Sequence, residues 1–60
     1  MPLSGDEMRK LFEQAGWKFV RQKGSHMRMQ KGKNFETIPR HKELKKGTEK
    51  ELLKRLEEKD

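Results

Sequence analysis

The residues best suited to chemistry lie in the segment 21–29, where one histidine stands among three permanent cations. His26 follows a Gly-Ser pair, and Arg21, Lys23 and Arg28 flank it in the sequence. An imidazole changes charge near neutral pH, so it can serve as a general base or a general acid. The pattern predicts proton transfer beside a bound polyanion. A histidine with a purely structural role is the alternative.

The two residues before the histidine suit phosphate binding. Gly24 permits a tight turn and a close approach of the backbone to a ligand. The Ser25 hydroxyl can donate a hydrogen bond to a phosphate oxygen. We therefore expect both to join Arg21, Lys23 and Arg28 in one phosphate-binding set.

Three further candidates come later in the chain. His41 could act as a second acid or base, bind phosphate, or simply belong to a basic loop. Lys45 and Lys46 precede a predicted helix, whose N-terminus attracts phosphate through its free N–H groups and its dipole. We expect these lysines to hold the backbone of the polyanion. The alternative is that they only keep the loop solvated.

Short elements must position these residues, and the first is a helix. Ser4 and Glu7 have the spacing of a capping box, and Leu3 with Met8 can form a hydrophobic staple around it. An apolar stripe follows at helical spacing, and Gly16 is a typical helix stop. The stripe comprises Met8, Leu11, Phe12 and Ala15.

Three short strands are predicted next. The first covers Trp17 to Val20 and ends in a polar turn at 21–24. The second starts at His26, with methionines 27 and 29 on one side and residues 26, 28 and 30 on the other. A hairpin loop at 31–34 leads to a third strand over 35–39, where a proline is tolerated at the end or on a sheet edge.

A second capping box, Thr48 with Glu51, predicts a final helix whose apolar stripe is Leu52, Leu53 and Leu56. The order helix, three strands, helix predicts an α+β fold. In it both helices pack on one face of a three-stranded antiparallel sheet, and the other face is open to solvent or ligand.

Composition narrows the class of protein. The chain has 60 residues, 28% of them hydrophobic, so we expect a single domain over residues 1–60 with a small core. No apolar run is long enough for a membrane span, and no signal peptide is recognisable, which favours the cytosol. The net charge of +6 is concentrated in residues 17–47, as in nucleic-acid-binding proteins.

Neither a metal site nor a cofactor is expected. The chain has no cysteine, and its two histidines lie 15 residues apart, which is not the spacing of a zinc site. The carboxylates in the first turns of the two predicted helices are better explained by helix capping than by metal binding.

The whole chain resembles the HicA family of bacterial toxins, which are mRNA interferases. The matching blocks follow the order and spacing of the family: Gly16-Trp17, Arg21-Gln-Lys-Gly-Ser-His26, Thr37-Ile-Pro-Arg-His41 and Glu43-Leu-Lys-Lys-Gly-Thr48. The resemblance implies a fold like the double-stranded RNA-binding domain and translation-independent cleavage of mRNA. It also implies a HicB antitoxin that covers the active site, and it places the catalytic histidine of the family at His26.

The chemistry of RNA agrees with this reading, because RNA carries its own nucleophile in the ribose 2′-hydroxyl. A minimal ribonuclease needs a base for that proton, cations for the phosphate charge and an acid for the leaving oxygen. Two alternatives remain open. The chain could be a non-catalytic RNA-binding module of the same fold, or its basic face could serve mainly to bind an acidic antitoxin.

Overall fold

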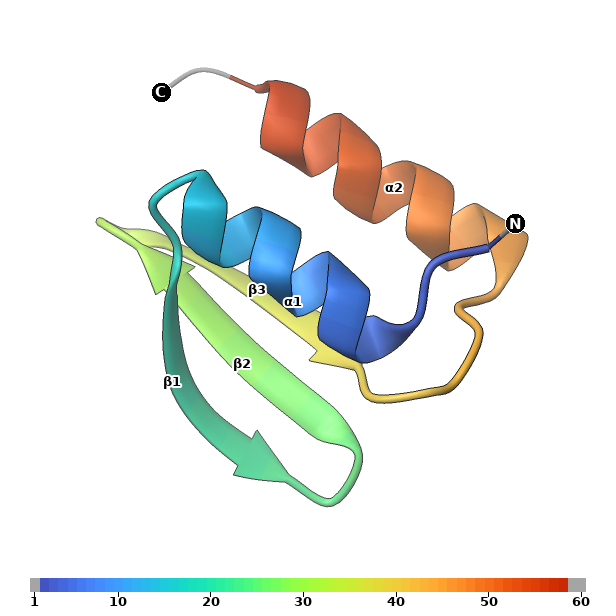
Figure 1. Cartoon of the computed structure of the whole chain (residues 1–60). Helices are drawn as coiled ribbons and strands as arrows, with labels where there is room; N and C mark the ends of the chain where they lie inside the picture. Colours follow the sequence, from blue (N-terminus) through green and yellow to red (C-terminus); the bar gives the residue numbers. More distant parts are fainter. Residues whose placement is uncertain (1, 59–60) are drawn as a thin grey trace.

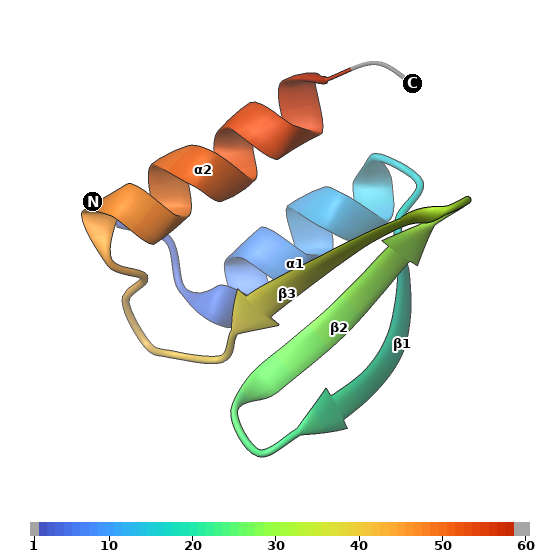
Figure 2. The same ribbon diagram turned by 180° about the vertical axis from the view of Figure 1, so that it is seen from behind.

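The computed structural model describes residues 2–58. It forms five elements in the order α1 (Gly5–Gln14), β1 (Lys18–Lys23), β2 (His26–Lys31), β3 (Asn34–Pro39) and α2 (Lys46–Glu57). The strands make one antiparallel sheet in the order β1-β2-β3. Both helices cover the same face of this sheet (Figures 1 and 2). The predicted α+β architecture is confirmed, including the open second face.

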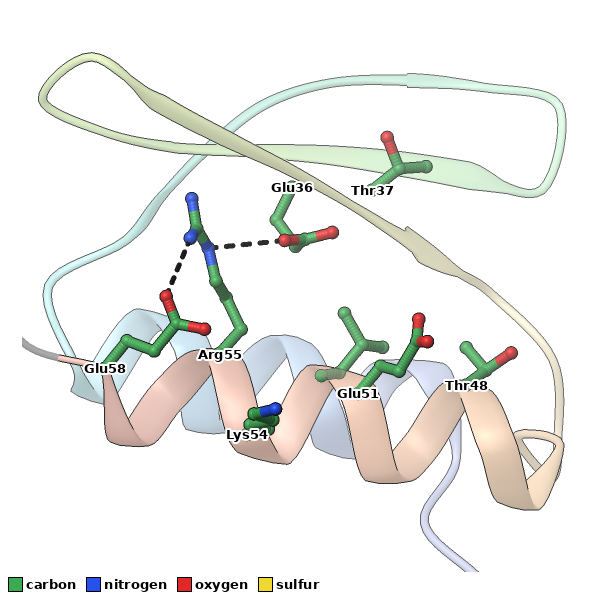
Figure 3. A pocket seen from close by; sticks show the side chains of 8 residues that line it. Glu36, Thr37, Thr48, Glu51, Lys54, Arg55 and Glu58 are labelled. Carbon is green, nitrogen blue, oxygen red and sulfur yellow. Dashed lines mark hydrogen bonds and ion pairs between the residues drawn. The ribbon is translucent and has the colours of Figure 1, made fainter.

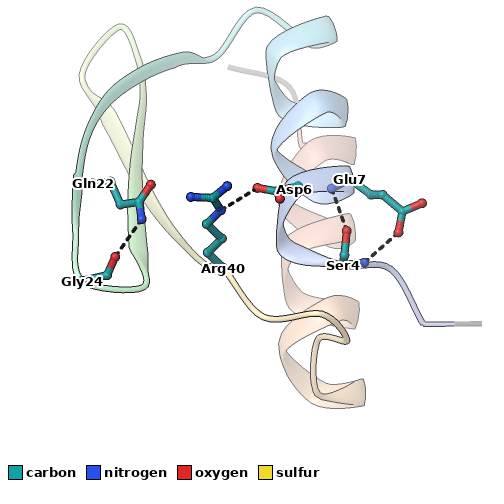
Figure 4. Close-up of polar contacts among 6 residues, drawn as sticks. All are labelled: Ser4, Asp6, Glu7, Gln22, Gly24 and Arg40. Atoms are coloured by element: carbon teal, nitrogen blue, oxygen red, sulfur yellow. Dashed lines mark hydrogen bonds and ion pairs between the residues drawn. The ribbon is translucent and has the colours of Figure 1, made fainter.

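The start of α1 is fixed by the predicted capping box. The Glu7 N–H donates to Ser4 Oγ at 3.1 Å, and the Ser4 N–H donates to Glu7 Oε1 at 2.9 Å (Figure 4). The hydrogen bond from the Ser4 N–H to the carboxylate, followed by the contribution of the Ser4 hydroxyl, holds the pKa of the Glu7 carboxyl below its ordinary value. At the other end Gly16 adopts a positive φ of 96° just after the helix, as a glycine stop does.

Gly5 brings the N-terminus of α1 into direct contact with the end of β3. A Cβ atom at this position would lie 2.1 Å from the carbonyl oxygen of Pro39 and 2.8 Å from the Cα of Arg40. The Gly5 N–H donates to the carbonyl of His41 at 2.8 Å. The Arg40 side chain reaches back to Asp6, with Nε 3.2 Å from Oδ1 (Figure 4). The absence of a side chain at Gly5 is thus what allows helix and strand to meet.

Two tight turns of the same design join the strands. Each has Gln-Lys-Gly followed by one more residue, and the glutamine amide donates to the glycine carbonyl, at 2.8 Å for Gln22 and 2.9 Å for Gln30. The glycines, Gly24 and Gly32, have φ near +60°, and no other residue type in the described chain has a positive φ. A positive φ only at the first turn residue is the mark of a type II′ hairpin.

The first turn corrects one prediction. Residues 21–23 were expected in the turn, but they continue β1, and only Gly24 and Ser25 form the connection. Two-residue turns match the right-handed twist of the flanking strands, so pairing can continue up to the Lys23–His26 pair. The change moves Arg21 and Lys23 from a loop onto the sheet.

The core lies between the sheet and the helices. Phe12 and Trp17 meet edge to face with ring centroids 5.1 Å apart. The methionines of β2 are fully buried, as the alternating pattern predicts. The buried hydrophobic residues are Met8, Phe12, Trp17, Met27, Met29, Ile38, Leu44 and Leu52.

The second predicted capping box is wrong. Helix α2 begins at Lys46, with Lys45 as an N-cap residue that makes no side-chain cap, so Thr48 lies inside the helix. The first-turn carboxylate of Glu49 instead accepts the N–H of Leu3, far away in the sequence. In the same segment before α1, the Leu3 carbonyl accepts a hydrogen bond from the Leu44 N–H at 2.8 Å. The first turn of α2 is thus held by a tertiary contact of Glu49, and the N-cap residue makes no side-chain cap.

Arg55 links α2 to the sheet. Its Nε lies 3.4 Å from Glu36 Oε2 on β3, and its Nη1 donates to Glu58 Oε2 at 3.1 Å (Figure 3). The guanidinium also stands over the Trp17 ring, 5.6 Å from its centroid. In Figure 3 Glu36 points from β3 towards α2, whereas the Thr37 side chain points away from it. Glu36 therefore faces the helix side, and its neighbours on β3 face the open side.

Candidate functional site

The open face of the sheet carries most of the candidate residues. Residues that pair directly across antiparallel strands point to the same side. His26, Arg28 and Gln30 alternate with the buried Met27 and Met29, so they point away from the helices. Their partners on the two outer strands share that side. The resulting open-face set is Lys18, Arg21, Lys23, His26, Arg28, Gln30, Phe35, Thr37 and Pro39. Val20 has no direct partner, but it follows the core-side Phe19 in β1 and so points to the open side as well.

A β-bulge at Val20 brings Arg21 onto this face. Phe19 pairs with Met29 on the core side, and strict alternation would return Arg21 to that side as well. The pairing instead shifts by one residue between Phe19 and Arg21, so that Arg21 faces Arg28. Such a bulge places two residues of one strand against one of its partner and re-aims the side chains that follow.

His26 occupies the first position of β2 and is exposed. It lies between Lys23 on one side and Pro39 on the other. The turn before it is held from across the sheet, because the Arg40 N–H donates to the carbonyl of Ser25 at 2.6 Å. The histidine thus has a fixed backbone and a side chain that solvent can reach, which is what proton transfer with a bound substrate needs.

The charge on this face has one sign. Four permanent cations, Lys18, Arg21, Lys23 and Arg28, belong to it. Among the strand residues the acidic side chain is Glu36, and it faces Arg55 on the helix side. Arg21 stands directly opposite Arg28, an arrangement that is destabilising without an anion nearby. The open face therefore favours a polyanion.

Comparison with known protein families places most of the chain in one family. Residues 5–57 match the model of a family described as HicA toxin of bacterial toxin-antitoxin. The chain belongs to the HicA toxin family. No curated protein and no solved structure matches it significantly. The HicA match spans all five elements, so both the open face and the helix layer lie within the family domain.

The structure gathers six of the nine predicted site residues around one hairpin. Arg21, Lys23 and Arg28 share the open face with His26, and Gly24 and Ser25 form the turn beside it. Gly24 has the positive φ of 60° that this turn requires. The predicted set is therefore spatially coherent, although its role in chemistry stays a prediction.

The other three predicted residues lie elsewhere. His41 is exposed in the loop after β3, and its backbone carbonyl holds the N-terminus of α1. Lys45 and Lys46 stand at the N-terminus of α2, in the helix layer, at the far end of that loop (Figure 1). The structure thus separates these lysines from the open face. If they contact a polyanion, they form a second binding region apart from that face.

Two residues near the site, Phe35 and Arg40, are not indicated as site residues by any motif in the sequence. Phe35 lies on the open face beneath Arg28, whose guanidinium carbon is 4.6 Å from the ring centroid. Arg40 ties the hairpin turn to α1 through its backbone and its side chain. Phe35 could have been found from the alternation with the apolar Ile38, three residues later, which puts the two on opposite faces.

Within residues 2–58 no three histidine, aspartate or glutamate side chains converge on a possible metal position. In the same range neither helix combines the length and the apolar character that crossing a bilayer requires.

Proposed function

We propose that this HicA family toxin is an endoribonuclease that cleaves mRNA in the cytoplasm, with His26 as its catalytic group and without a metal ion or cofactor. The observation that carries the proposal is the exposed imidazole on a cationic face without carboxylates, within a domain of the HicA family. A proton-accepting group beside a phosphate-binding surface is the minimum that RNA self-cleavage needs.

The reaction would be an internal transesterification. His26 takes the proton of a ribose 2′-hydroxyl, and that oxygen attacks the adjacent phosphorus. The bond from phosphorus to the 5′-oxygen breaks, and the leaving oxygen takes up a proton from the imidazolium, from His41 or from water. The products are a 2′,3′-cyclic phosphate and a 5′-hydroxyl end. Arg21, Lys23 and Arg28 would stabilise the charge that develops on the phosphate oxygens.

A toxin of this kind needs a partner that restrains it. We propose a HicB-type antitoxin that covers the open face and so blocks access of RNA to His26. The support is the membership in a toxin-antitoxin family and the uniform positive charge of that face, which an acidic protein surface would complement.

The test compares RNA cleavage by the wild type and by His26→Ala, both in EDTA. Loss of a general base typically lowers the rate by 10²–10⁴-fold. We expect His26→Ala to lose activity to this extent while its melting temperature is unchanged. We also expect a 2′-O-methyl group at the cleavage site to block the wild type, since it removes the nucleophile. The cleaved ends should be a cyclic phosphate and a 5′-hydroxyl.

The matched control is His41→Ala, a second histidine on an exposed loop. Retained activity in this variant would show that one proton carrier is enough, and a similar loss would assign His41 as the acid. The proposal is wrong if the wild type and His26→Ala cleave equally. If both only retard RNA on a gel, the chain is a non-catalytic RNA-binding module. If the wild type neither cleaves nor binds RNA, the open face serves the antitoxin alone.

A further inference from the structure

Two large apolar side chains remain exposed in the described part of the chain, and both belong to the open face. Val20 is 46% exposed at the bulge of β1, and Phe35 is 45% exposed on β3. The core of this protein is small, and burial of one more aromatic ring would have stabilised it. An exposed apolar side chain of this size therefore suggests a binding surface. The ring is also not folded under a helix, because the helices cover the opposite face.

The exposed ring is already paired with a cation. The Arg28 guanidinium stands over Phe35, 4.6 Å from the ring centroid, and both side chains remain exposed. A guanidinium held on an aromatic ring forms a flat layered surface. Aromatic rings and arginine planes are the surfaces on which proteins stack unpaired nucleic-acid bases.

We propose that Phe35 and Arg28 form a stacking platform for one unpaired base of single-stranded RNA. This inference rests on the proposed function for the identity of the ligand. Arg28 lies two residues along β2 from His26, a separation of about 7 Å. The stacked base would therefore belong to a nucleotide close to the cleaved one. Its phosphates would lie over Arg21 and Lys23, the cations beside the histidine.

The charge of the surface argues for RNA as the occupant. Cations surround the platform, and none of the strand residues that point to the open face is an aspartate or a glutamate. A single strand offers both the negative backbone and the free base faces that such a surface can bind. Base stacking tolerates any sequence, so the platform would position the strand without selecting a base.

The experiment measures binding of two non-cleavable oligonucleotides of equal length. One is a 2′-O-methyl RNA with all its bases, and the other has the same backbone without bases. The variants are Phe35→Ala and Phe35→Leu, of which the second keeps an apolar side chain but removes the aromatic plane. Val20→Ala, at an equally exposed apolar position of the same face, is the matched control.

We expect both Phe35 variants to bind the base-bearing strand about 5- to 100-fold more weakly, the range for loss of one stacked base. Their binding of the strand without bases, and the slope of affinity against salt, should stay as in the wild type, since no charge is removed. Val20→Ala should stay within about twofold on both strands. A Phe35→Trp variant should show fluorescence quenching by the base-bearing strand beyond that of the buried Trp17 in the wild type.

Equal affinity of Phe35→Ala and the wild type for the base-bearing strand would overturn the platform, as would equal weakening on both strands. A Phe35 requirement seen only for an acidic antitoxin, and not for RNA, would assign the ring to a protein interface and overturn it too. These results are independent of cleavage. If His26→Ala cleaves like the wild type but the Phe35 effects hold, the platform stands and the proposed catalytic role of His26 fails.

Discussion

Arg21 shows how one extra residue changes the role of a side chain. The bulge at Val20 turns Arg21 to the open face, directly opposite Arg28. Two guanidinium groups at this spacing repel one another unless an anion lies between them. A phosphate group is such an anion, and it accepts bidentate hydrogen bonds from arginine. Arg21 should therefore bind the RNA backbone rather than a base.

We predict that Arg21→Gln weakens RNA binding by a similar factor for all sequences. It should also reduce the slope of log affinity against log salt by about 0.7 to 1, the effect of one lost phosphate contact. Binding titrations at several salt concentrations, with two unrelated single-stranded sequences, measure both quantities. Lys50→Gln, an exposed cation of the same charge on α2, is the control and should leave the slope nearly unchanged.

A sequence-selective loss in Arg21→Gln would contradict a backbone contact and point to base recognition. An unchanged salt slope would mean that Arg21 does not contact phosphate at all. Either result would mean that the phosphate backbone of the RNA does not contact β1 at Arg21.

The residues of the site could be predicted to different degrees. Alternation with the buried Met27 and Met29 was enough to place His26 and Arg28 on the open face. Alternation did not predict the position of Arg21, because a bulge shifts the register without any residue type that marks it. The stacking of Arg28 on Phe35 depends on the pairing of β2 with β3, which only the folded sheet defines.

At the scale of elements, the packing of α1 on the end of β3 determines how the site is held. Gly5 permits this contact, and the loop it touches supplies the Arg40 N–H that holds the Ser25 carbonyl. A change at Gly5 should therefore act on stability and, through the loop, on the hairpin that carries His26.

We predict opposite effects for the same substitution at two glycines. Gly5→Ala places a methyl group against the Pro39 backbone, which cannot move as a flexible side chain could, and should cost about 1–3 kcal/mol of unfolding free energy. Gly47→Ala adds a methyl group in open space in the first turn of α2, and should stabilise by about 0.4–1 kcal/mol. Chemical denaturation of the two variants and the wild type measures the difference.

A neutral Gly5→Ala variant would mean that α1 can shift away from β3 without loss, and the tight contact would then not be needed. Destabilisation by Gly47→Ala would contradict its position inside a regular helix. The pair shares one chemical change, so the intrinsic helix preference of alanine cancels in the comparison.

The two capping boxes show why local patterns predict some boundaries and not others. The box at Ser4 forms as predicted, because both partners are free to turn to each other. The similar pattern of Thr48 and Glu51 does not form, since α2 already starts at Lys46 and its first turn is held by a contact between the Glu49 carboxylate and the Leu3 N–H. The Leu3 donor lies 46 residues away in the sequence from Glu49, so a local window cannot show this contact.

At the scale of the whole molecule, the acidic side chains of the described residues lie away from the open face. The Asp and Glu residues of the described chain lie on the helices, just after α2 at Glu58, in the 40–45 loop or on the helix side of β3. The open face instead holds like-charged pairs such as Arg21 and Arg28. The unbound fold thus carries electrostatic repulsion within a small domain. A bound polyanion removes that repulsion, and a ligand that binds only the native state raises its stability.

We therefore predict that single-stranded RNA stabilises this protein strongly and that salt abolishes the effect. The His26→Ala variant, which should not cleave its ligand, is melted with and without a non-cleavable single strand. A ligand at about 100 times its dissociation constant adds about 2.7 kcal/mol, which for a domain of this size is a shift on the order of 10 °C.

The shift should shrink as salt rises from about 50 to 200 mM, because counterion release drives the binding. The same titration on a variant with Arg21→Gln and Lys23→Gln together is the control, and its shift should be smaller at every salt concentration. A shift that persists in high salt would show that apolar contacts dominate the interface, and an absent shift at low salt would show that the open face does not bind single strands. The double variant separates the sheet from the lysines at the N-terminus of α2, since a full shift in that variant would place the main polyanion contact in the helix layer.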